Sequence, residues 1–198
     1  MKNEILTLNQ IEEFIKSDSK HCLVKGTDVN KKHLNILKYL NSLGKKLRIL
    51  IRINSMQNSE TFLGYNAQTN KLREVGNLNI YVDSMQVSSQ MNTPKEFSCI
   101  IIYPIDSLKG INDKNIDDIL NNKVASKIFW ISHHDSIDYS YLKEICDIKD
   151  EVYIDSDDDI IHNNIKNNTK LKVEETFDKI LVDGLSYFHI EDAINLNQ

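Results

Sequence analysis

The stretch Phe97-Ser-Cys-Ile-Ile-Ile-Tyr-Pro-Ile-Asp106 is the most apolar run of the chain, and the rest of the sequence is arranged around it. Its residues from Cys99 to Tyr103 are apolar one after another, without alternation. Because successive side chains of a strand point to opposite faces, this run predicts a strand buried on both faces, which is typical of a parallel sheet covered by helices. Pro104 has no N–H to donate and should end the strand.

Strand and helix patterns alternate around this run. The expected strands of the main sheet are all rich in apolar residues, and they are Cys22–Gly26, Leu47–Ile53, Phe97–Tyr103, Lys127–Ile131 and Glu151–Ile154. A helical pattern from Val29 to Leu43 joins the first two strands into a βαβ unit, whose strands should be parallel. The sequence therefore predicts a single α/β domain over residues 1–198, with a three-layer Rossmann-like or degenerate P-loop-like fold and a mostly parallel sheet of about five strands.

Residues 54–95 show a different pattern, which we interpret as a hairpin and loop insertion. Three short runs, Thr61–Tyr65, Lys71–Val75 and Leu78–Val82, are separated by glycine and asparagine. This spacing indicates an antiparallel hairpin or small meander beside the main sheet. The polar residues Ser84–Lys95 have little to bury and are expected to form a loop.

The two ends of the chain also carry local signals. Thr7–Gln10 fits a capping box, which predicts that an amphipathic helix begins there. Near the other end, Phe177–Val182 and Tyr187–Ile190 flank Asp183-Gly184, and this arrangement predicts a closing hairpin.

The composition excludes several classes of protein. With 198 residues, a net charge of −5 and a pI near 5.7, the chain has no general electrostatic attraction to nucleic acid, which we do not expect as a partner. Its three cysteines form no CxxC pair, which favours free thiols in a reducing compartment. No apolar run approaches the roughly 20 residues of a membrane span, and the first residues lack the apolar core of a signal peptide. We therefore expect a cytoplasmic protein with no membrane association. Its richness in Asn, Ile and Lys is associated with low-GC bacteria and their mobile elements.

Polar residues collect where the predicted strands end. The strand-end segments are Lys25-Gly26-Thr27-Asp28, Asn54-Ser55, Asp83-Ser84, Asp106-Ser107, Ser132-His133-His134-Asp135 and Asp155-Ser156-Asp157. In an open parallel sheet these ends meet at the edge where ligands bind, so the segments could line one cleft. Alternatively, each strand leads into a helix that needs an N-cap, and Asp, Ser, Asn and Thr are the residues that supply one.

The order of these pieces resembles a P-loop NTPase core, in which a strand, a turn of small residues and a helix come first and an aliphatic strand ending in an acid comes later. The resemblance places Lys25, Gly26 and Thr27 in the phosphate-binding turn and Asp106 at the position of the Walker B acid. A working P-loop reads GxxxxGK[ST]. The turn Val24-Lys-Gly-Thr-Asp-Val29 lacks GK[ST] and carries an acid where a phosphate would need neutralising. The resemblance therefore implies a relative that has lost phosphate binding and uses no cofactor.

The polar cluster that most suggests chemistry is Ser132-His133-His134-Asp135. Adjacent imidazoles can ligate a metal or act as acid and base, and Asp106 could assist from a neighbouring strand. We expect the strand from Lys127 to continue through both histidines, which would direct their rings to opposite faces and prevent a shared metal. The run Asp155-Ser-Asp-Asp-Asp159 does not meet the EF-hand pattern, so we expect no calcium site there.

The sequence is compatible with two functions from different classes. The first is a non-catalytic binding or regulatory protein, with another protein as its partner, on a degenerate nucleotide-binding scaffold. The second is a metal-dependent hydrolase or nucleotide-processing enzyme that uses Asp106, His133, His134 and Asp135. The fold by itself does not choose between them, because sheets of this kind host many chemistries.

Overall fold

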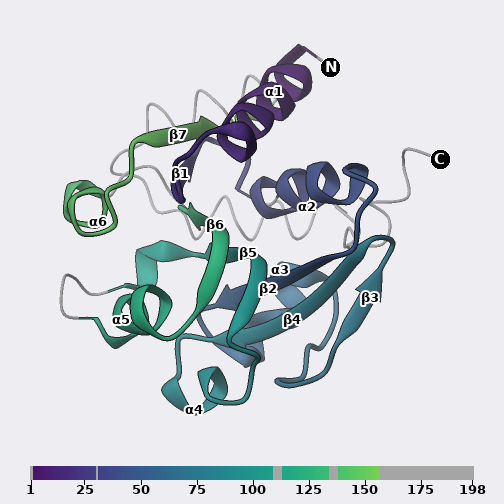
Figure 1. The fold of residues 1–198 in the computed structure, drawn as a ribbon, viewed down its shortest axis with the longest axis vertical. Coiled ribbons are helices and arrows are strands. Elements are labelled where there is room, and N and C mark those ends of the chain that lie inside the picture. Colours follow the sequence, from purple (N-terminus) through teal and green to yellow (C-terminus); the bar gives the residue numbers. More distant parts are fainter. Residues whose placement is uncertain (1, 30, 109–112, 134–137, 157–198) are drawn as a thin grey trace, which may run out of the picture.

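The computed structural model describes residues 2–156 except 30, 109–112 and 134–137. Its centre is a sheet with the strand order β3-β4-β2-β5-β6-β1-β7 (Figure 1). The strands are β1 (His21–Lys25), β2 (Leu47–Ile53), β3 (Arg73–Val75), β4 (Leu78–Ser84), β5 (Glu96–Tyr103), β6 (Val124–Ile131) and β7 (Asp150–Tyr153). Every neighbouring pair is parallel except β3 and β4, which are antiparallel. The predicted α/β fold class with a mostly parallel sheet is confirmed, and the sheet has seven strands in the described part of the chain.

Strand β5 is the central strand that the apolar run predicts. It lies between β2 and β6, and Ile100, Ile101 and Ile102 are at most 1% exposed. Alternate residues of the run face two different clusters of buried side chains, with Ile101 in one and Ile100 and Ile102 in the other. The strand ends at Tyr103, directly before Pro104, as the missing N–H of proline requires.

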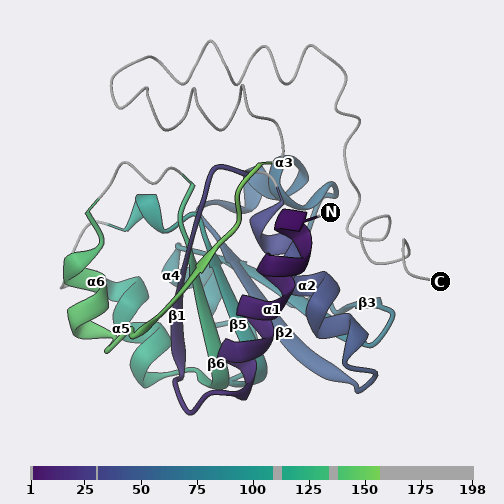
Figure 2. The same ribbon diagram turned by 90° about the horizontal axis from the view of Figure 1, so that it is seen from above.

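Helices cover both faces of the sheet and complete a three-layer architecture. On one face lie α1 (Lys2–Lys16) and α2 (Lys32–Ser42), which contribute Phe14, Leu37 and other apolar residues to the first cluster. On the other face lie α5 (Lys114–Asn121) and α6 (Ser140–Ile145), which contribute Ile116 and Leu142 to the second cluster. Figure 2 shows these two helix pairs on opposite sides of the strands.

The segment predicted as an insertion is more closely built into the sheet than expected. The antiparallel pairing is present between β3 and β4, but β4 also pairs in parallel with β2 along its whole length. Thr61–Tyr65 is not extended, because α3 (Ser59–Leu63) occupies most of it and Gly64 caps that helix with a φ of 72°. The expected loop Ser84–Lys95 contains the short helix α4 (Val87–Gln90). Short 3₁₀ turns follow β2 and β5 at Met56–Asn58 and Ile105–Ser107.

The first helix begins earlier than the capping-box pattern at Thr7–Gln10 predicts. Helix α1 already begins at Lys2, so Thr7 lies inside the helix rather than at its start. Its buried hydroxyl donates to the backbone oxygen of Tyr153, 3.4 Å away, and so helps to dock α1 on β7. The hairpin predicted over 177–190 lies outside the described residues. None of the described helices is long and apolar enough to cross a bilayer.

Candidate functional site

The candidate site lies at the carboxyl ends of β1, β5, β6 and β7. Strands β1 and β6 are neighbours, but the helix after β1 packs on one face of the sheet and the helix after β6 packs on the other. This reversal is a topological switch point, where open α/β sheets bind their ligands. Four of the predicted strand-end segments meet there, and they are those that contain Gly26, Asp106, Ser132 and Asp155.

The turn after β1 is closed against β7. Gly26 has a φ of +119°, and a Cβ at this position would lie 2.1 Å from the backbone oxygen of Ile154. The N–H of Thr27 donates to Oδ1 of Asp155 at 3.0 Å, and the Thr27 hydroxyl reaches the same oxygen at 3.2 Å. The N–H of Asp28 donates to Ile154 O at 3.1 Å. Donors that a phosphate-binding turn would offer to a ligand are therefore engaged by β7 and the segment after it.

A second carboxylate, that of Asp28, binds a backbone N–H just before the following helix. Oδ1 of Asp28 accepts from the N–H of Lys31 at 3.2 Å, directly before α2 begins at Lys32. The N-terminus of a helix attracts negative charge, and in P-loops a phosphate takes this place. Here a side chain of the turn itself supplies the anion.

Lys32 stands at the position of the P-loop lysine, which sequence analysis missed. In GxxxxGK[ST] the lysine follows the first glycine by six positions, and Lys32 follows Gly26 by the same number (32 − 26), with Lys31 and His33 in place of the second Gly and the Ser/Thr. The side chain is fully buried, and Nζ donates to the backbone oxygen and the hydroxyl of Ser132 at 3.1 and 3.2 Å. The ammonium group therefore binds the end of β6. The spacing alone could have identified this lysine.

The neighbouring ring of His33 is buried next to Tyr103. The two rings are stacked, with centroids 5.3 Å apart, and neither nitrogen of His33 has a hydrogen-bond partner in the described part of the chain. Burial lowers the pKa of His33 to about 4, so the imidazole is neutral at pH 7. Where a P-loop presents a hydroxyl for Mg²⁺, this chain has an enclosed neutral ring.

Asp106 and His133 do come together, but through the histidine backbone. The N–H of His133 donates to Oδ2 of Asp106 at 2.5 Å, and the hydroxyl of Tyr139 donates to Oδ1 at 2.7 Å. The imidazole Nδ1 of His133 lies 2.8 Å from the hydroxyl of Tyr103, which itself donates to Val29 O at 3.0 Å. Burial raises the pKa of Tyr103 far above its usual range, so this hydroxyl stays protonated.

The expected course of the strand through the histidines is wrong. Strand β6 ends at Ile131, and Ser132 and His133 lie beyond it. His134 and Asp135 lie outside the described residues. No group of three His, Cys, Asp or Glu side chains that could hold a metal ion is present among the residues that the structure describes.

The side chain of Lys25, the first residue named for the turn, is directed to β7. Its Nζ lies 2.9 Å from Oε2 of Glu151 and 4.9 Å from the ring centroid of Tyr153. Of the three residues proposed for the turn, Gly26 and Thr27 thus form the contact with β7 and the segment after it, and Lys25 forms a partly exposed ion pair with β7.

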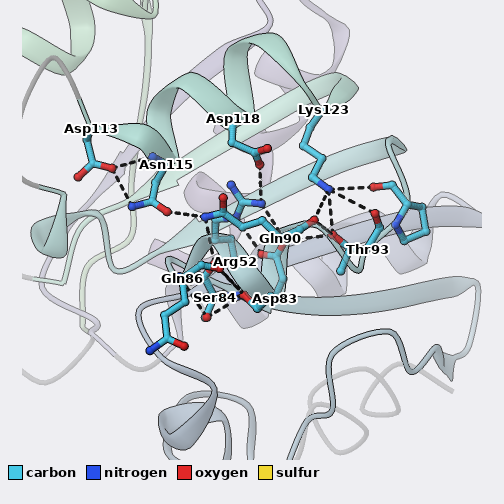
Figure 3. A network of polar contacts seen from close by, with 12 residues as sticks. Arg52, Asp83, Ser84, Gln86, Gln90, Thr93, Asp113, Asn115, Asp118 and Lys123 are labelled. Atoms are coloured by element: carbon cyan, nitrogen blue, oxygen red, sulfur yellow. Dashed lines mark hydrogen bonds and ion pairs between the residues drawn. The ribbon is translucent and has the colours of Figure 1, made fainter.

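A buried polar network occupies the carboxyl ends of β2 and β4 (Figure 3). Arg52 and Asp83 are both 0% exposed and form two parallel hydrogen bonds of 2.8 Å, and a second guanidinium contact reaches Asp118 of α5 at 2.9 Å. Lys123 Nζ donates to the backbone oxygen of Gln90 at 2.9 Å and to the hydroxyl of Thr93 at 3.0 Å. The two cations, Arg52 and Lys123, thus lie beside the carboxylates of Asp83 and Asp118, and the carboxylate of Asp113 joins the network through Asn115 and Gln90. Buried charges that are paired in this way are typical of a structural cluster.

Similarity to known proteins extends to fold only. No family model and no curated protein matches the chain. The large terminase of a thermophilic bacteriophage is similar in structure, with a TM-score of 0.52, 7% identity and coverage of 90% of this chain and 50% of that chain. A second crystal form of that terminase, in complex with ADP, has a TM-score of 0.49 at the same identity and coverage. The chain thus spans about half the length of these solved chains. The first of these similarities, together with the sheet order, shows that the chain has a P-loop-like α/β fold.

Proposed function

We propose that this protein is a non-catalytic binding or regulatory protein, built on a P-loop-like scaffold whose phosphate-binding edge is closed by the protein's own side chains. The observation that carries the proposal is the contact between Thr27 and Asp155. A carboxylate oxygen accepts from both the N–H and the hydroxyl of Thr27, at 3.0 and 3.2 Å, in the turn where a nucleotide phosphate would have to bind.

Electrostatics around the turn support the same conclusion. A nucleotide brings several negative charges to a P-loop, which meets them with free N–H groups and a lysine. Here the carboxylates of Asp28 and Asp155 already bind N–H groups of the turn and of the first residues after it. A phosphate in the same place would meet two like charges, and such a juxtaposition is unfavourable.

The position of Lys32 supports the proposal independently. A lysine that binds β- and γ-phosphates must reach the ligand, but Lys32 is 0% exposed and its ammonium group donates to Ser132. Releasing it would leave the backbone oxygen of Ser132 without this donor in the protein interior, which costs free energy. The lysine therefore serves to fix β6 against α2.

The proposed partner is another protein, since the net charge of −5 gives no general attraction to nucleic acid. Such a protein would use the rigid three-layer scaffold as a support for contact surfaces rather than for turnover. The association with low-GC bacteria or their mobile elements rests on composition and belongs to the same proposal.

Nucleotide binding and hydrolysis test the proposal directly. A ligand at 100 times its Kd stabilises the folded state by about 2.7 kcal/mol. We expect millimolar ATP with Mg²⁺ to change the unfolding free energy by only a few tenths of a kcal/mol, with no phosphate release above a protein-free blank. A known P-loop ATPase in the same assay is the positive control. Saturable stabilisation that disappears in Lys32→Met would overturn the proposal.

The enzyme alternative is tested by metal titration. Zn²⁺ or Mn²⁺ is added to the wild type and to His133→Ala, His134→Ala and Asp106→Asn. Micromolar binding that is lost in all three variants would establish a shared metal site and reject the non-catalytic proposal, because helix capping does not bring ligands within about 2.0–2.2 Å of one ion. We expect no binding, or binding that does not depend on Asp106, since its two carboxylate oxygens accept from His133 N–H and Tyr139 OH.

A further inference from the structure

A group of exposed basic residues lies at the opposite edge of the sheet, where the strands begin. Lys45 and Lys46 come directly before β2, Arg48 is the second residue of β2, and Lys95 comes directly before β5. All four residues are exposed, and β2 and β5 are neighbours in the sheet. We call this group the amino-end basic surface. Strand β2 is 7 residues long, so at about 3.3 Å per residue the surface lies roughly 20 Å from the candidate site at the carboxyl ends.

Contacts with the backbone hold two of these side chains in place. The N–H of Arg48 donates to the hydroxyl of Ser98 at 3.1 Å, and its Nη1 donates to the backbone oxygen of Glu96 at 3.4 Å, so the guanidinium group lies next to the first residue of β5. Nζ of Lys46 donates to Gly76 O at 3.1 Å. Each side chain uses one of its several N–H donors in these contacts, and the other donors can bind a ligand.

No carboxylate of a described residue balances these cations. Elsewhere, the exposed lysines Lys16, Lys31 and Lys149 each form an ion pair with an acid two to four positions away. The described part of the chain offers no such partner within 4.0 Å to any basic group of the amino-end basic surface. Glu96 is the exposed acid next to Lys95, and it forms no ion pair with a described residue either. Neighbouring cations repel one another, and an anionic ligand would relieve this repulsion.

An exposed apolar side chain borders the cations. Val124, the first residue of β6, is 63% exposed, and its N–H donates to Lys95 O at 2.8 Å. Phe97, the aromatic residue of β5 nearest to Lys95 in sequence, is buried, so its ring is not available for stacking with the bases of a nucleic acid. Cations beside an exposed aliphatic side chain, without such a ring, suit a peptide ligand better than a nucleic acid.

We propose that the amino-end basic surface binds an acidic segment of a partner protein, with Val124 as a neighbouring apolar contact. This inference rests on the proposed function, since it assigns the surface that the proposed protein partner contacts. Complementary charge gives such a contact its specificity. Salt screens charges over about 8–10 Å, so a short acidic segment responds to the local cations rather than to the net charge of −5. A long nucleic acid would extend beyond the surface and meet the acidic remainder of the protein.

The test is a titration of fluorescently labelled hexaglutamate with the full chain, followed by fluorescence anisotropy at low and at physiological ionic strength. Hexaglutamine is the uncharged control peptide, and a labelled single-stranded DNA hexanucleotide is the second anion. We expect saturable binding of hexaglutamate that weakens as NaCl is added, and no binding of hexaglutamine. Binding of the hexanucleotide that is tighter than that of hexaglutamate would overturn the proposal in favour of a nucleic-acid partner.

Two triple variants with the same change in net charge separate a local effect from a general one. We expect about tenfold weaker binding of hexaglutamate, or a greater loss, in the variant that removes three cations of the surface, Lys45→Gln/Lys46→Gln/Lys95→Gln. The matched control removes three exposed lysines that have acidic partners, and its affinity should stay within about twofold of the wild type. That control is Lys16→Gln/Lys31→Gln/Lys149→Gln.

The melting temperature of each variant shows that it is folded, since all the substituted side chains are exposed. The proposal is wrong if hexaglutamate does not saturate the wild type, or if the two triple variants lose affinity equally. The outcome is independent of the nucleotide assay. Binding of ATP would reject the proposed function, whereas failure of hexaglutamate to bind would reject only the assignment of this surface.

Discussion

Lys32 and Ser132 are separated by 100 positions in the chain, yet the ammonium group of one donates to both the backbone oxygen and the hydroxyl of the other. Ser132 in turn donates from its hydroxyl to Val24 O at 3.1 Å, so α2, β1 and β6 are joined at one point. The lysine that the glycine spacing aligns with a phosphate-binding position thus has a structural contact at the edge of the sheet.

This contact predicts that replacing Lys32 affects stability. Lys32→Met keeps the length of the side chain and removes the donor, and it should lower the unfolding free energy by about 1–3 kcal/mol because buried acceptors lose a partner. The measurement is urea denaturation followed by circular dichroism. Lys31→Met is the control, since the Lys31 side chain is 54% exposed and should contribute less than about 1 kcal/mol. Equal effects in the two variants would show that the contact with Ser132 is not important.

Gly26 should tolerate no side chain. In Gly26→Ala the new Cβ would lie 2.1 Å from Ile154 O, and the φ of +119° is unfavourable for any L-residue. We expect a loss well above the roughly 1–2 kcal/mol that a left-handed conformation alone costs. Gly44→Ala is a matched control with a φ of +67° and no atom within 4 Å of the new Cβ. A thermal or urea unfolding experiment that ranks Gly44→Ala as the more damaging change would contradict the close approach of the turn to β7.

The buried pair of Arg52 and Asp83 should behave as a unit. Arg52→Met leaves Asp83 without its two hydrogen bonds of 2.8 Å, and loss of one partner of a buried pair costs about 3–5 kcal/mol. The double variant Arg52→Met/Asp83→Asn should cost less than the sum of the single variants, and a double-mutant cycle measures this coupling. The exposed pair of Lys149 and Asp147 provides the contrast, because water screens it and Lys149→Met should change stability far less than Arg52→Met does. If the effects of the two single variants add up to that of the double variant, Arg52 and Asp83 are not energetically coupled.

His33 makes stability depend on pH in a defined window. Its folded-state pKa is lowered to about 4, against 6.5 for an exposed histidine, so between these values the unfolded chain binds a proton that the folded chain does not. Above pH 6.5 the ring is neutral in both states, so the unfolding free energy is not reduced by His33. As the pH falls from 6.5 toward 4, the unfolding free energy decreases, by about 3 kcal/mol in total.

The variant His33→Phe tests this by keeping an aromatic ring next to Tyr103 while removing the titrating group. We expect the slope of unfolding free energy against pH to decrease by up to one proton between pH 4 and 6.5, with little change in slope above pH 7. Denaturant titrations at several pH values give this slope directly. An unchanged slope would mean that His33 is not the buried neutral ring that its surroundings indicate.

Local signals in the sequence determined much of the fold. Consecutive apolar residues predicted the doubly covered strand at 97–103, because such a run can be buried only with helices on both faces. Asp113 is one of the residue types that favour N-caps, and its side chain caps α5 by accepting from the N–H of Asn115 at 2.8 Å. The pairing of β4 with β2 was not predicted. Alternation of apolar and polar residues indicates that a strand has one buried face, but it does not indicate which strand lies beside it.

The candidate site depended on tertiary structure to a much greater degree. The sequence placed Gly26, Thr27 and Asp155 at the ends of strands, but only the sheet order, with β7 beside β1, brings the Asp155 carboxylate to the N–H of Thr27. Arg52 stands in a run that is otherwise mostly apolar, and nothing local indicates that Asp83 and Asp118 will face it.

The physical reason is that burial and backbone turns depend on residues close in sequence, whereas the contacts of the site join residues far apart in sequence. Residue patterns report whether a side chain is buried and how the backbone turns, since these depend on neighbours within a few positions. Hydrogen bonds such as that of Lys32 with Ser132 depend on which strands become adjacent, and that is settled by packing of the whole chain. The sequence by itself therefore determined the layers and the central strand, and the tertiary structure alone decided that the turn after β1 is closed by a carboxylate from beyond β7.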